Sequence, residues 1–328
     1  MLPGPSTGPA ADGSPASPPS AARLIQAVPN VSEGRQSEVL RELAGAADGH
    51  GAHLLDWSAD PSHNRSVFTL AGSADGLAAA VLRLAGLAVR HVDLRRHRGA
   101  HPRMGAVDVV PFVPLGETPM GDCVDLAHRV GRALADRFGI PVYWYEEAAV
   151  EDRRRPLEAV RRGQFEGLAA RMRDPDWRPD CGPPAPHPSA GASAVGARPP
   201  LIAFNIDLTT DDLAAARRIA GRIRERDGGL PGVKALGIRL PHRGIAQVST
   251  NLVDYRRTSL DALVDAVVRE AGALGVEVGG TELVGLVPAD ALPPSGVDRL
   301  RIAGFTPDRI LDVRLRRAAG LPGPGAGT

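Results

Sequence analysis

The hydrophobic and polar positions of this chain fall into two successive series, and each series mixes strand and helix periodicity. In the first series, apolar or alternating runs bounded by turn-forming residues predict strands; these are 24–31, 52–57, 65–72, 104–115 and 140–145. Helical spacing of apolar residues predicts three helices in this series. The first begins at residue 32, the second covers 73–92 and the third covers 120–138. The order strand, helix, strand, strand, helix, strand is that of a ferredoxin-like fold, followed here by one more helix and strand.

The second series repeats the same order. Strands are predicted over 201–208, 233–240, 245–254 and 276–288. Helices are predicted over 210–228 and 259–275, with Thr210 and Ser259 as N-caps. In the first series, Ser32 and Glu33 are expected to open the first helix and Ser73 or Asp75 to cap the second. We therefore expect an α/β (α+β) protein with two ferredoxin-like βαββαβ-type subdomains, whose helices pack on mainly antiparallel sheets.

The boundaries of these units follow from composition. Residues 1–23 are rich in Pro, Ser, Gly and Ala and lack the apolar stretch of a signal peptide, so we expect a disordered tail. The ordered chain is expected to divide into 24–197 and 198–318, with a second disordered tail at 319–328. Residues 182–197 are again rich in Gly, Pro, Ser and Ala, and composition alone favours a flexible linker there.

Composition and charge exclude several classes of protein. Hydrophobic residues make up 43% of the 328 residues, which is enough for a substantial core, and the formal net charge is +1. A charge so close to neutral gives no general argument for nucleic acid or an anionic membrane as partner. No apolar run is long enough for a transmembrane helix. Cys123 and Cys181 form neither a metal-ligand pattern nor a disulfide framework, so we expect a reducing, cytoplasmic location.

The most conspicuous motif is RRHRGAHPRMGAVDVVPF, residues 95–112, in which a basic stretch passes directly into an apolar strand. Binding of RNA is disfavoured, because the predicted strands carry few aromatic residues on which bases could stack. A metal site is also disfavoured. His97 and His101 have the spacing of helix ligands, but Gly99 and Pro102 oppose a helix and the neighbouring arginines would repel a cation.

A catalytic loop is the third interpretation of this motif. Nearby arginines disfavour the charged imidazolium form of a histidine, and a neutral histidine is what a general base requires. Arginines can also bind carboxylates through two parallel hydrogen bonds. On the pattern alone, this interpretation and that of a solvated loop with structural histidines both remain open.

Several motifs together resemble one known family, glutamate formimidoyltransferase, which is also the formiminotransferase part of formimidoyltransferase-cyclodeaminase. The resemblance runs in order from Leu24 to Pro288. The motifs that carry it are VPNVSEGR, DPSHNRSVFTLAG, HRGAHPRMGAVDVVPFVP, IPVYWYEEAA, LIAFNIDL, AQVSTNLVD and ELVGLVP.

The resemblance implies transfer of a formimino group from N-formimino-L-glutamate to N5 of tetrahydrofolate, a late step of histidine degradation. It implies His101, in the HPRMG motif, as the catalytic base and then acid, with tetrahydrofolate as co-substrate and no metal. It further implies a homodimer, and cyclodeaminase activity is expected in a separate protein. The substrates expected are N-formimino-L-glutamate and tetrahydrofolate, including its polyglutamylated form, and neither nucleic acid nor membrane is expected as a partner.

The resemblance also assigns the Gly-Pro-rich segment to the folate site, in place of a flexible linker. The residues concerned are Gly182, Pro183, Pro184, Ala185, Pro186, His187, Pro188, Ser189, Ala190 and Gly191.

Five further side chains are candidates for substrate binding. Arg65 and Arg103 could bind substrate carboxylates or form structural ion pairs. Asn64 could hydrogen-bond the formimino group or cap a turn, and Asn205 and Asn251 need partners if they are buried on their strands. Two rival functions remain open, glutamate N-formyltransferase using 5-formyltetrahydrofolate and a non-catalytic folate-binding protein.

Overall fold

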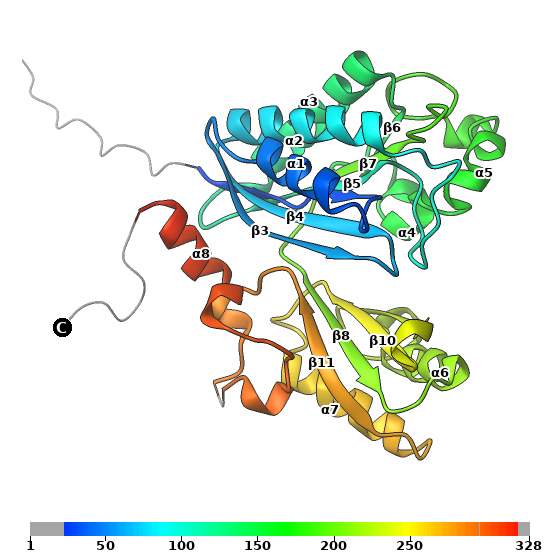
Figure 1. Ribbon diagram of the computed structural model, residues 1–328, viewed down its shortest axis with the longest axis vertical. Coiled ribbons are helices and arrows are strands. Elements are labelled where there is room, and N and C mark those ends of the chain that lie inside the picture. Colours follow the sequence, from blue (N-terminus) through cyan, green and yellow to red (C-terminus); the bar gives the residue numbers. More distant parts are fainter. Residues whose placement is uncertain (1–22, 295, 321–328) are drawn as a thin grey trace, which may run out of the picture.

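The computed structural model describes residues 23–294 and 296–320, which form two subdomains that each carry helices on a β-sheet (Figure 1). Figure 1 shows α1, α2 and α3 on the upper face of the first sheet and the second subdomain beneath it. In the part of the chain described, no helix is both long and apolar enough to cross a membrane.

The first sheet has seven strands, in the spatial order β3, β4, β1 with β2, β5, β7, β6. Their bounds are β1 Ile25–Ala27, β2 Asn30–Val31, β3 Ala52–Asp60, β4 Arg65–Gly72, β5 Val107–Pro114, β6 Val142–Glu146 and β7 Ser193–Ala197. β1 and β2 occupy one position between β4 and β5 and are separated at Pro29, which has no N–H to donate to the ladder. All pairings as far as β5 are antiparallel, whereas β7 pairs in parallel with both β5 and β6.

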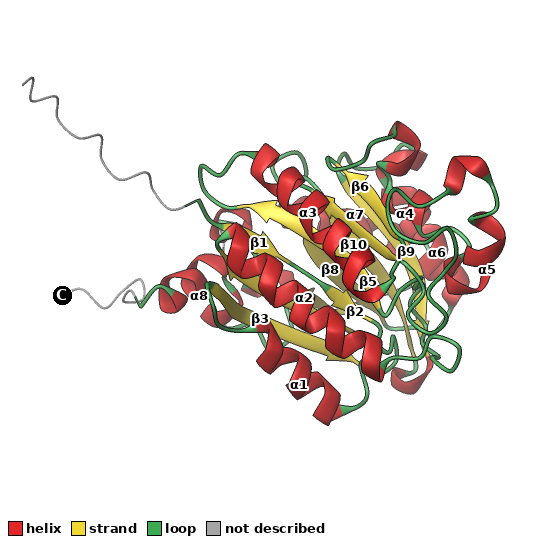
Figure 2. Cartoon of the chain, turned by 90° about the horizontal axis from the view of Figure 1, so that it is seen from above, coloured by secondary structure: helices red, strands yellow, loops and turns green. Residues whose placement is uncertain are grey.

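Helices cover both faces of this sheet in different places. Helices α1 (Ser37–Ala47), α2 (Ala74–His91) and α3 (Met120–Phe138) lie side by side over one face (Figure 2). The short helices α4 (Leu157–Val160) and α5 (Gln164–Arg171) pack against the opposite face. The alternation of side chains along β6 explains this arrangement, because Val142 and Trp144 join the core under α1–α3 while Tyr143 and Tyr145 join the core under α4 and α5.

The second subdomain has a sheet of four strands in the order β11, β8, β10, β9, all antiparallel. Its strands are β8 Ile202–Leu208, β9 Val233–Leu240, β10 Ile245–Leu252 and β11 Val278–Val284. Its helices are α6 Leu213–Ile223, α7 Leu260–Gly272 and α8 Leu311–Ala318. This is the ferredoxin-like order, in which the fourth strand (β11) lies beside the first (β8) and the third (β10) lies between the first and the second (β9). In the first sheet, β1–β5 follow the same order if β1 and β2 are taken together as its first strand. The predicted fold class is therefore confirmed.

The two subdomains meet through a small apolar cluster and a few polar contacts. Leu55 of β3 and Ala71 of β4 pack with Leu286 and Leu311 of the second subdomain. Lys234 of β9 lies 3.6 Å from Glu146 and 3.3 Å from Glu158 of the first subdomain. The second subdomain thus rests on the face of the first sheet that α1–α3 leave open.

Three local predictions differ from the structure. Helix α1 begins at Ser37 and not at residue 32, because the Glu33 carboxylate accepts hydrogen bonds from the N–H groups of Arg35 and Gln36 ahead of the helix. The cap of α6 is Asp212, which accepts from the N–H of Ala214, and not Thr210.

The third difference concerns the end of the Gly-Pro-rich segment. Ser193–Ala197 is the fully buried strand β7, so this part of the expected linker is a central strand of the sheet. The predicted disordered tails lie outside the described residues, except for Arg23, which pairs with Asp122 at 3.0 Å, and residues 319–320.

Candidate active site

The loop between α2 and β5, residues 92–106, carries the basic motif and lies against two other backbone segments. The N–H of Ala100 donates to the carbonyl of Ser62, in the turn between β3 and β4. A Cβ on Gly99 would collide with the carbonyl of His63, so only glycine allows the loop to lie so close to that turn. The loop therefore lies between the β3–β4 turn and the start of β5.

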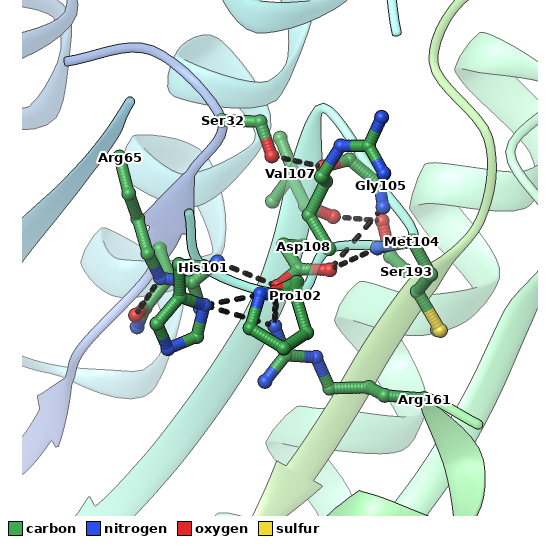
Figure 3. Close-up of polar contacts among 12 residues, drawn as sticks. Ser32, Arg65, His101, Pro102, Met104, Gly105, Val107, Asp108, Arg161 and Ser193 are labelled. Atoms are coloured by element: carbon green, nitrogen blue, oxygen red, sulfur yellow. Dashed lines mark hydrogen bonds and ion pairs between the residues drawn. The ribbon is translucent and has the colours of Figure 1, made fainter. Parts of the chain in front are cut away.

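Asp108 holds the loop in place through hydrogen bonds and ion pairs. It is fully buried at the start of β5, and its Oδ1 accepts hydrogen bonds from the N–H groups of Met104 at 2.7 Å and Gly105 at 3.2 Å. Its Oδ2 accepts from Arg65 Nη1 at 2.6 Å and Arg161 Nη2 at 2.7 Å (Figure 3). Burial alone raises the pKa of Asp108, but Arg161, Arg65 and the backbone donors outweigh it and lower this pKa to about 2. The carboxylate is therefore charged at all ordinary pH values.

His101 lies above this ion-pair network and has a defined tautomer. Its Nδ1 lies 2.8 Å from the carbonyl oxygen of Pro102, which can only accept a hydrogen bond (Figure 3). We therefore assign the proton to Nδ1 and the lone pair to Nε2. Arg161 Nη2, at 3.4 Å from the same Nδ1, then donates to the Pro102 carbonyl and to Asp108. The loop thus fixes the ring and leaves Nε2 free to accept a proton.

The environment of His101 keeps it neutral. Burial, and after it the charges of Arg65 and Arg161, hold the pKa of His101 well below its usual value. This lowering of the pKa is in the direction that the predicted neutral histidine requires, but burial, Arg65 and Arg161 cause it, and not the arginines of the motif. Arg95 is exposed and pairs with Asp93 at 2.8 Å, whereas Arg65 and Arg161 come from β4 and from the end of α4.

Arg103 has a protein carboxylate as its partner. Its guanidinium donates to both oxygens of Glu166, at 2.8 and 2.7 Å, and its Nε donates to His97 Nδ1 at 3.1 Å. The other ring nitrogen of His97 donates to the carbonyl of Asn64 at 2.9 Å, which gives His97 a positioning role that the sequence left open. Arg103 thus forms an ion pair within the protein, which was one of its two predicted roles. For the other role, binding of a substrate carboxylate, that carboxylate would have to replace Glu166.

Asn64 and Arg65 connect the β3–β4 turn to its neighbours. Asn64 has a positive φ of 48°, its Oδ1 accepts from the N–H of Gly34 at 2.9 Å, and its Nδ2 donates to the carbonyl of Arg98 at 3.1 Å. Arg65 also donates from Nε to Asn30 Oδ1 at 3.1 Å. Both candidates lie beside the loop of His101, but their side chains already have partners in the protein.

Asn205 and Asn251 lie on the second sheet, on the face opposite α6 and α7. Asn205 is buried and donates to Glu282 at 3.1 Å, whereas Asn251 is exposed. The contact from the second subdomain toward the β3–β4 turn is made by His242, whose ring lies 3.0 Å from the hydroxyl of Ser62. The structure therefore groups Asn64 and Arg65 with His101 and does not join Asn205 or Asn251 to them by a hydrogen bond among the described residues.

The Gly-Pro-rich segment packs directly on the loop of His101. The carbonyl of Ser189 accepts from the N–H of Leu94 at 2.8 Å, and that of Ala190 accepts from Ala106 at 2.9 Å. His187 Nδ1 accepts from the N–H groups of Ser189 and Ala190 at 3.3 and 3.0 Å, which closes a tight turn. The segment thus holds both ends of the loop in place, while Gly182 to Ala185 are exposed.

Two surface hollows border the loop of His101, and the first of them also borders the Gly-Pro-rich segment. One, of about 530 Å³, is lined by Arg95, Arg98, Phe165, Pro186 and His187, among others. The second, of about 420 Å³, is lined by His97, Arg98, Arg103 and Glu166 with neighbouring residues. Neither is lined by His101, but both share Arg98 and Glu166, and so they border the same loop.

Three important residues were not among those predicted, namely Asp108, Arg161 and Glu166. A lone Asp inside an apolar strand is a signal for a buried ion pair, since a buried charge must be compensated. Its partner Arg161 is 53 positions away in the chain, and no local pattern marks it.

Within residues 23–294 and 296–320, no group of three or more His, Cys, Asp or Glu side chains is placed to hold a metal ion.

Comparison with known proteins finds matches that span most of the chain. The family model of the formiminotransferase domain, N-terminal subdomain, matches residues 24–198, and that of the formiminotransferase domain matches residues 203–297. A glutamate formimidoyltransferase of Streptococcus pyogenes is 43% identical over 83% of this chain and 91% of its own. One of Thermoplasma acidophilum is 40% identical over 91% of this chain and 99% of its own.

A longer relative matches over part of its length. The formimidoyltransferase-cyclodeaminase of Gallus gallus is 44% identical over 83% of this chain, and the match spans 51% of the chicken protein. A solved structure of pitrilysin aligns with a TM-score of 0.21 and 11% identity, over 79% of this chain and 34% of its own, which is too weak to bear on the fold. From the two domain matches and the extent of these identities, this chain belongs to the formiminotransferase family.

Proposed function

We propose that this protein is a glutamate formimidoyltransferase, which transfers the formimino group of N-formimino-L-glutamate to N5 of tetrahydrofolate. The products are 5-formimidoyltetrahydrofolate and L-glutamate. The observation that carries the proposal is His101 itself, a neutral imidazole fixed through Nδ1 to the Pro102 carbonyl and left with a free lone pair on Nε2. Family membership and the names of the relatives support the same reaction.

The chemistry follows from the atoms that react. When N5 attacks the formimino carbon, a new N–C bond forms and N5 must lose a proton. Nε2 of His101 accepts that proton, and general-base assistance of this kind contributes about 10²–10⁴-fold to a rate. The bond from carbon to the glutamate nitrogen then breaks, and that nitrogen must receive a proton.

For the folate, we propose the turn of the Gly-Pro-rich segment and the hollow that it borders. Phe165, Pro186 and Leu94 give the hollow an apolar surface, and Arg95 and Arg98 give it cationic groups for the carboxylates of folate and its polyglutamate tail. A homodimer, a cytoplasmic location and separate cyclodeaminase activity are further proposals that rest on the family resemblance.

The test is to offer the purified protein two pairs of substrates. We expect N-formimino-L-glutamate with tetrahydrofolate to give 5-formimidoyltetrahydrofolate, detected by its ultraviolet absorbance. Faster turnover of 5-formyltetrahydrofolate with L-glutamate would identify a glutamate N-formyltransferase instead. Tight binding of tetrahydrofolate without product from either pair would contradict an enzymatic function.

A further inference from the structure

His63 is the second histidine of this site, and the reaction as described so far leaves its side chain without a role. It lies in the turn between β3 and β4, and its ring centroid is 5.6 Å from that of His101, at an interplanar angle of 57°. Its side chain is 13% exposed. The two imidazoles therefore face the same small region, although they come from separate loops.

The hydrogen bonding of His63 is incomplete. Its Nε2 is buried and has no hydrogen-bond partner among the described residues. Leaving a buried polar atom unpaired is unfavourable, so in native proteins such an atom calls for an explanation, and a functional role is one. Its Nδ1 lies 3.7 Å from Oδ2 of Asp60, a carboxylate that compensates the charge of the imidazolium form. The ring of His63 thus has Nε2 without a hydrogen-bond partner among the described residues on one side, and the carboxylate of Asp60 near Nδ1 on the other.

Formimino transfer requires two proton transfers, one from N5 and one to the glutamate nitrogen, and His101 is suited to only one of them. Its Nδ1 is held by Pro102, and Arg65 and Arg161 oppose a lasting positive charge on its ring. We propose that His63 is the general acid that delivers a proton to the departing glutamate nitrogen, while His101 takes the proton from N5. This inference rests on the proposed function and adds a second catalytic residue to it.

The proposed sequence balances. N5 attacks the formimino carbon, the N5–C bond forms as the π pair of the C=N bond moves to the imino nitrogen, and the N5 proton passes to Nε2 of His101. The C=N bond then re-forms, Nε2–H of the His63 imidazolium gives its proton to the glutamate nitrogen, and the bond from carbon to that nitrogen breaks with its electron pair on nitrogen. His101 is then charged and His63 neutral. Transfer of one proton from His101 to His63, directly or through water, restores both rings.

Several charged and titratable groups lie around His63. Asp60 faces it from its own turn, and His101 faces it from the α2–β5 loop. Arg65 and Arg161 are the cations whose charges act on His101. From the second subdomain, His242 reaches the adjacent Ser62. Because the general acid must be protonated, its loss of a proton should appear as the basic limb of the kcat profile.

The experiment compares His63→Asn with His53→Asn, an exposed histidine on β3 that serves as the control. We expect His63→Asn to lower kcat by about 10²-fold with little change in KM, because an acid acts in the transition state. We also expect the basic limb of its kcat profile to disappear. The control should retain wild-type values, and His63→Gln should behave as His63→Asn if the latter folds poorly.

Chemical rescue separates proton transfer from a structural role. Added imidazole should restore part of the activity of His63→Gly and leave that of His53→Gly unchanged. Wild-type kcat in folded His63→Asn, or a loss of kcat with an unchanged basic limb and no rescue, would overturn the role of His63. An inactive wild-type protein in the same assay would instead overturn the proposed function, so the two failures are distinguishable.

Discussion

Arg161 shows how a single side chain links the buried ion pair to the reacting histidine. It donates to Asp108 and to the Pro102 carbonyl, and its charge lowers the pKa of His101. The base is active only when neutral, so activity is lost as the pH falls through the pKa of His101. Because that pKa lies well below 6.5, the wild-type protein should keep its kcat/KM below pH 6.5.

We therefore predict that Arg161→Met moves the acid limb of the kcat/KM profile to higher pH. Removal of this cation brings the pKa of His101 back toward its ordinary value, since one of the charges that oppose the imidazolium is gone. The matched control is Arg162→Met, because Arg162 is exposed on the next position of the chain. The measurement is kcat/KM between pH 5 and pH 8, and an acid limb at the same pH in both variants would argue against this electrostatic account.

At the residue scale, the sequence singled out the motif but not the side chains that hold it in place. The resemblance selected His101, and the basic motif indicated a neutral histidine. The sequence could not assign Asp108, Arg161 and Glu166, since their roles depend on contacts between segments that only the fold brings together. For Arg103 the two interpretations were evenly balanced, and its pairing with Glu166 became visible only in the structure.

The Gly-Pro-rich segment contacts the loop of His101 at both of the loop's ends through backbone hydrogen bonds. Gly191 has a φ of 70°, and a Cβ there would collide with the carbonyl of Met104. We predict that Gly191→Ala lowers the free energy of unfolding by at least about 1 kcal/mol, because both the backbone conformation and the contact are unfavourable to a side chain.

Gly121→Ala is the control for that variant. Gly121 lies in α3, and a Cβ at this position would have no other atom within 4 Å, so alanine there should be neutral or stabilising by about 0.5–1 kcal/mol. Urea denaturation measures both, and equal stability of the two variants would refute the assigned role of the turn. Since this turn holds both ends of the loop of His101, kcat of Gly191→Ala should also fall.

Elements with strong periodicity or clear caps were predicted well. Ser73 and Ser259 accept hydrogen bonds at the starts of α2 and α7, as predicted, and α3 has the predicted bounds. Strand β7 was missed as a strand because SAVGA has small residues and no alternation, and only its burial between β5 and β6 makes it part of the sheet. Composition alone cannot distinguish such a strand from a linker.

At the scale of the whole molecule, the relation between the subdomains depends on a small apolar contact. Leu311 of α8 is 7% exposed and packs with Leu55, Ala71 and Leu286. We predict that Leu311→Ala lowers the free energy of unfolding by about 2–4 kcal/mol, as truncation of a buried leucine does. The control Val268→Ala, at an exposed position of α7, should change it by less than about 0.5 kcal/mol. Denaturant unfolding tests this, and similar values for both variants would contradict the assigned interface.

The central claim is that His101 is the base of a formimino transfer. The most direct measurement is formation of 5-formimidoyltetrahydrofolate by wild-type protein and by His101→Asn, with tetrahydrofolate binding measured on both by calorimetry. We predict that the variant binds tetrahydrofolate with wild-type affinity and that its kcat is lower by at least about 10²-fold. Wild-type turnover by a folded His101→Asn protein would contradict the account.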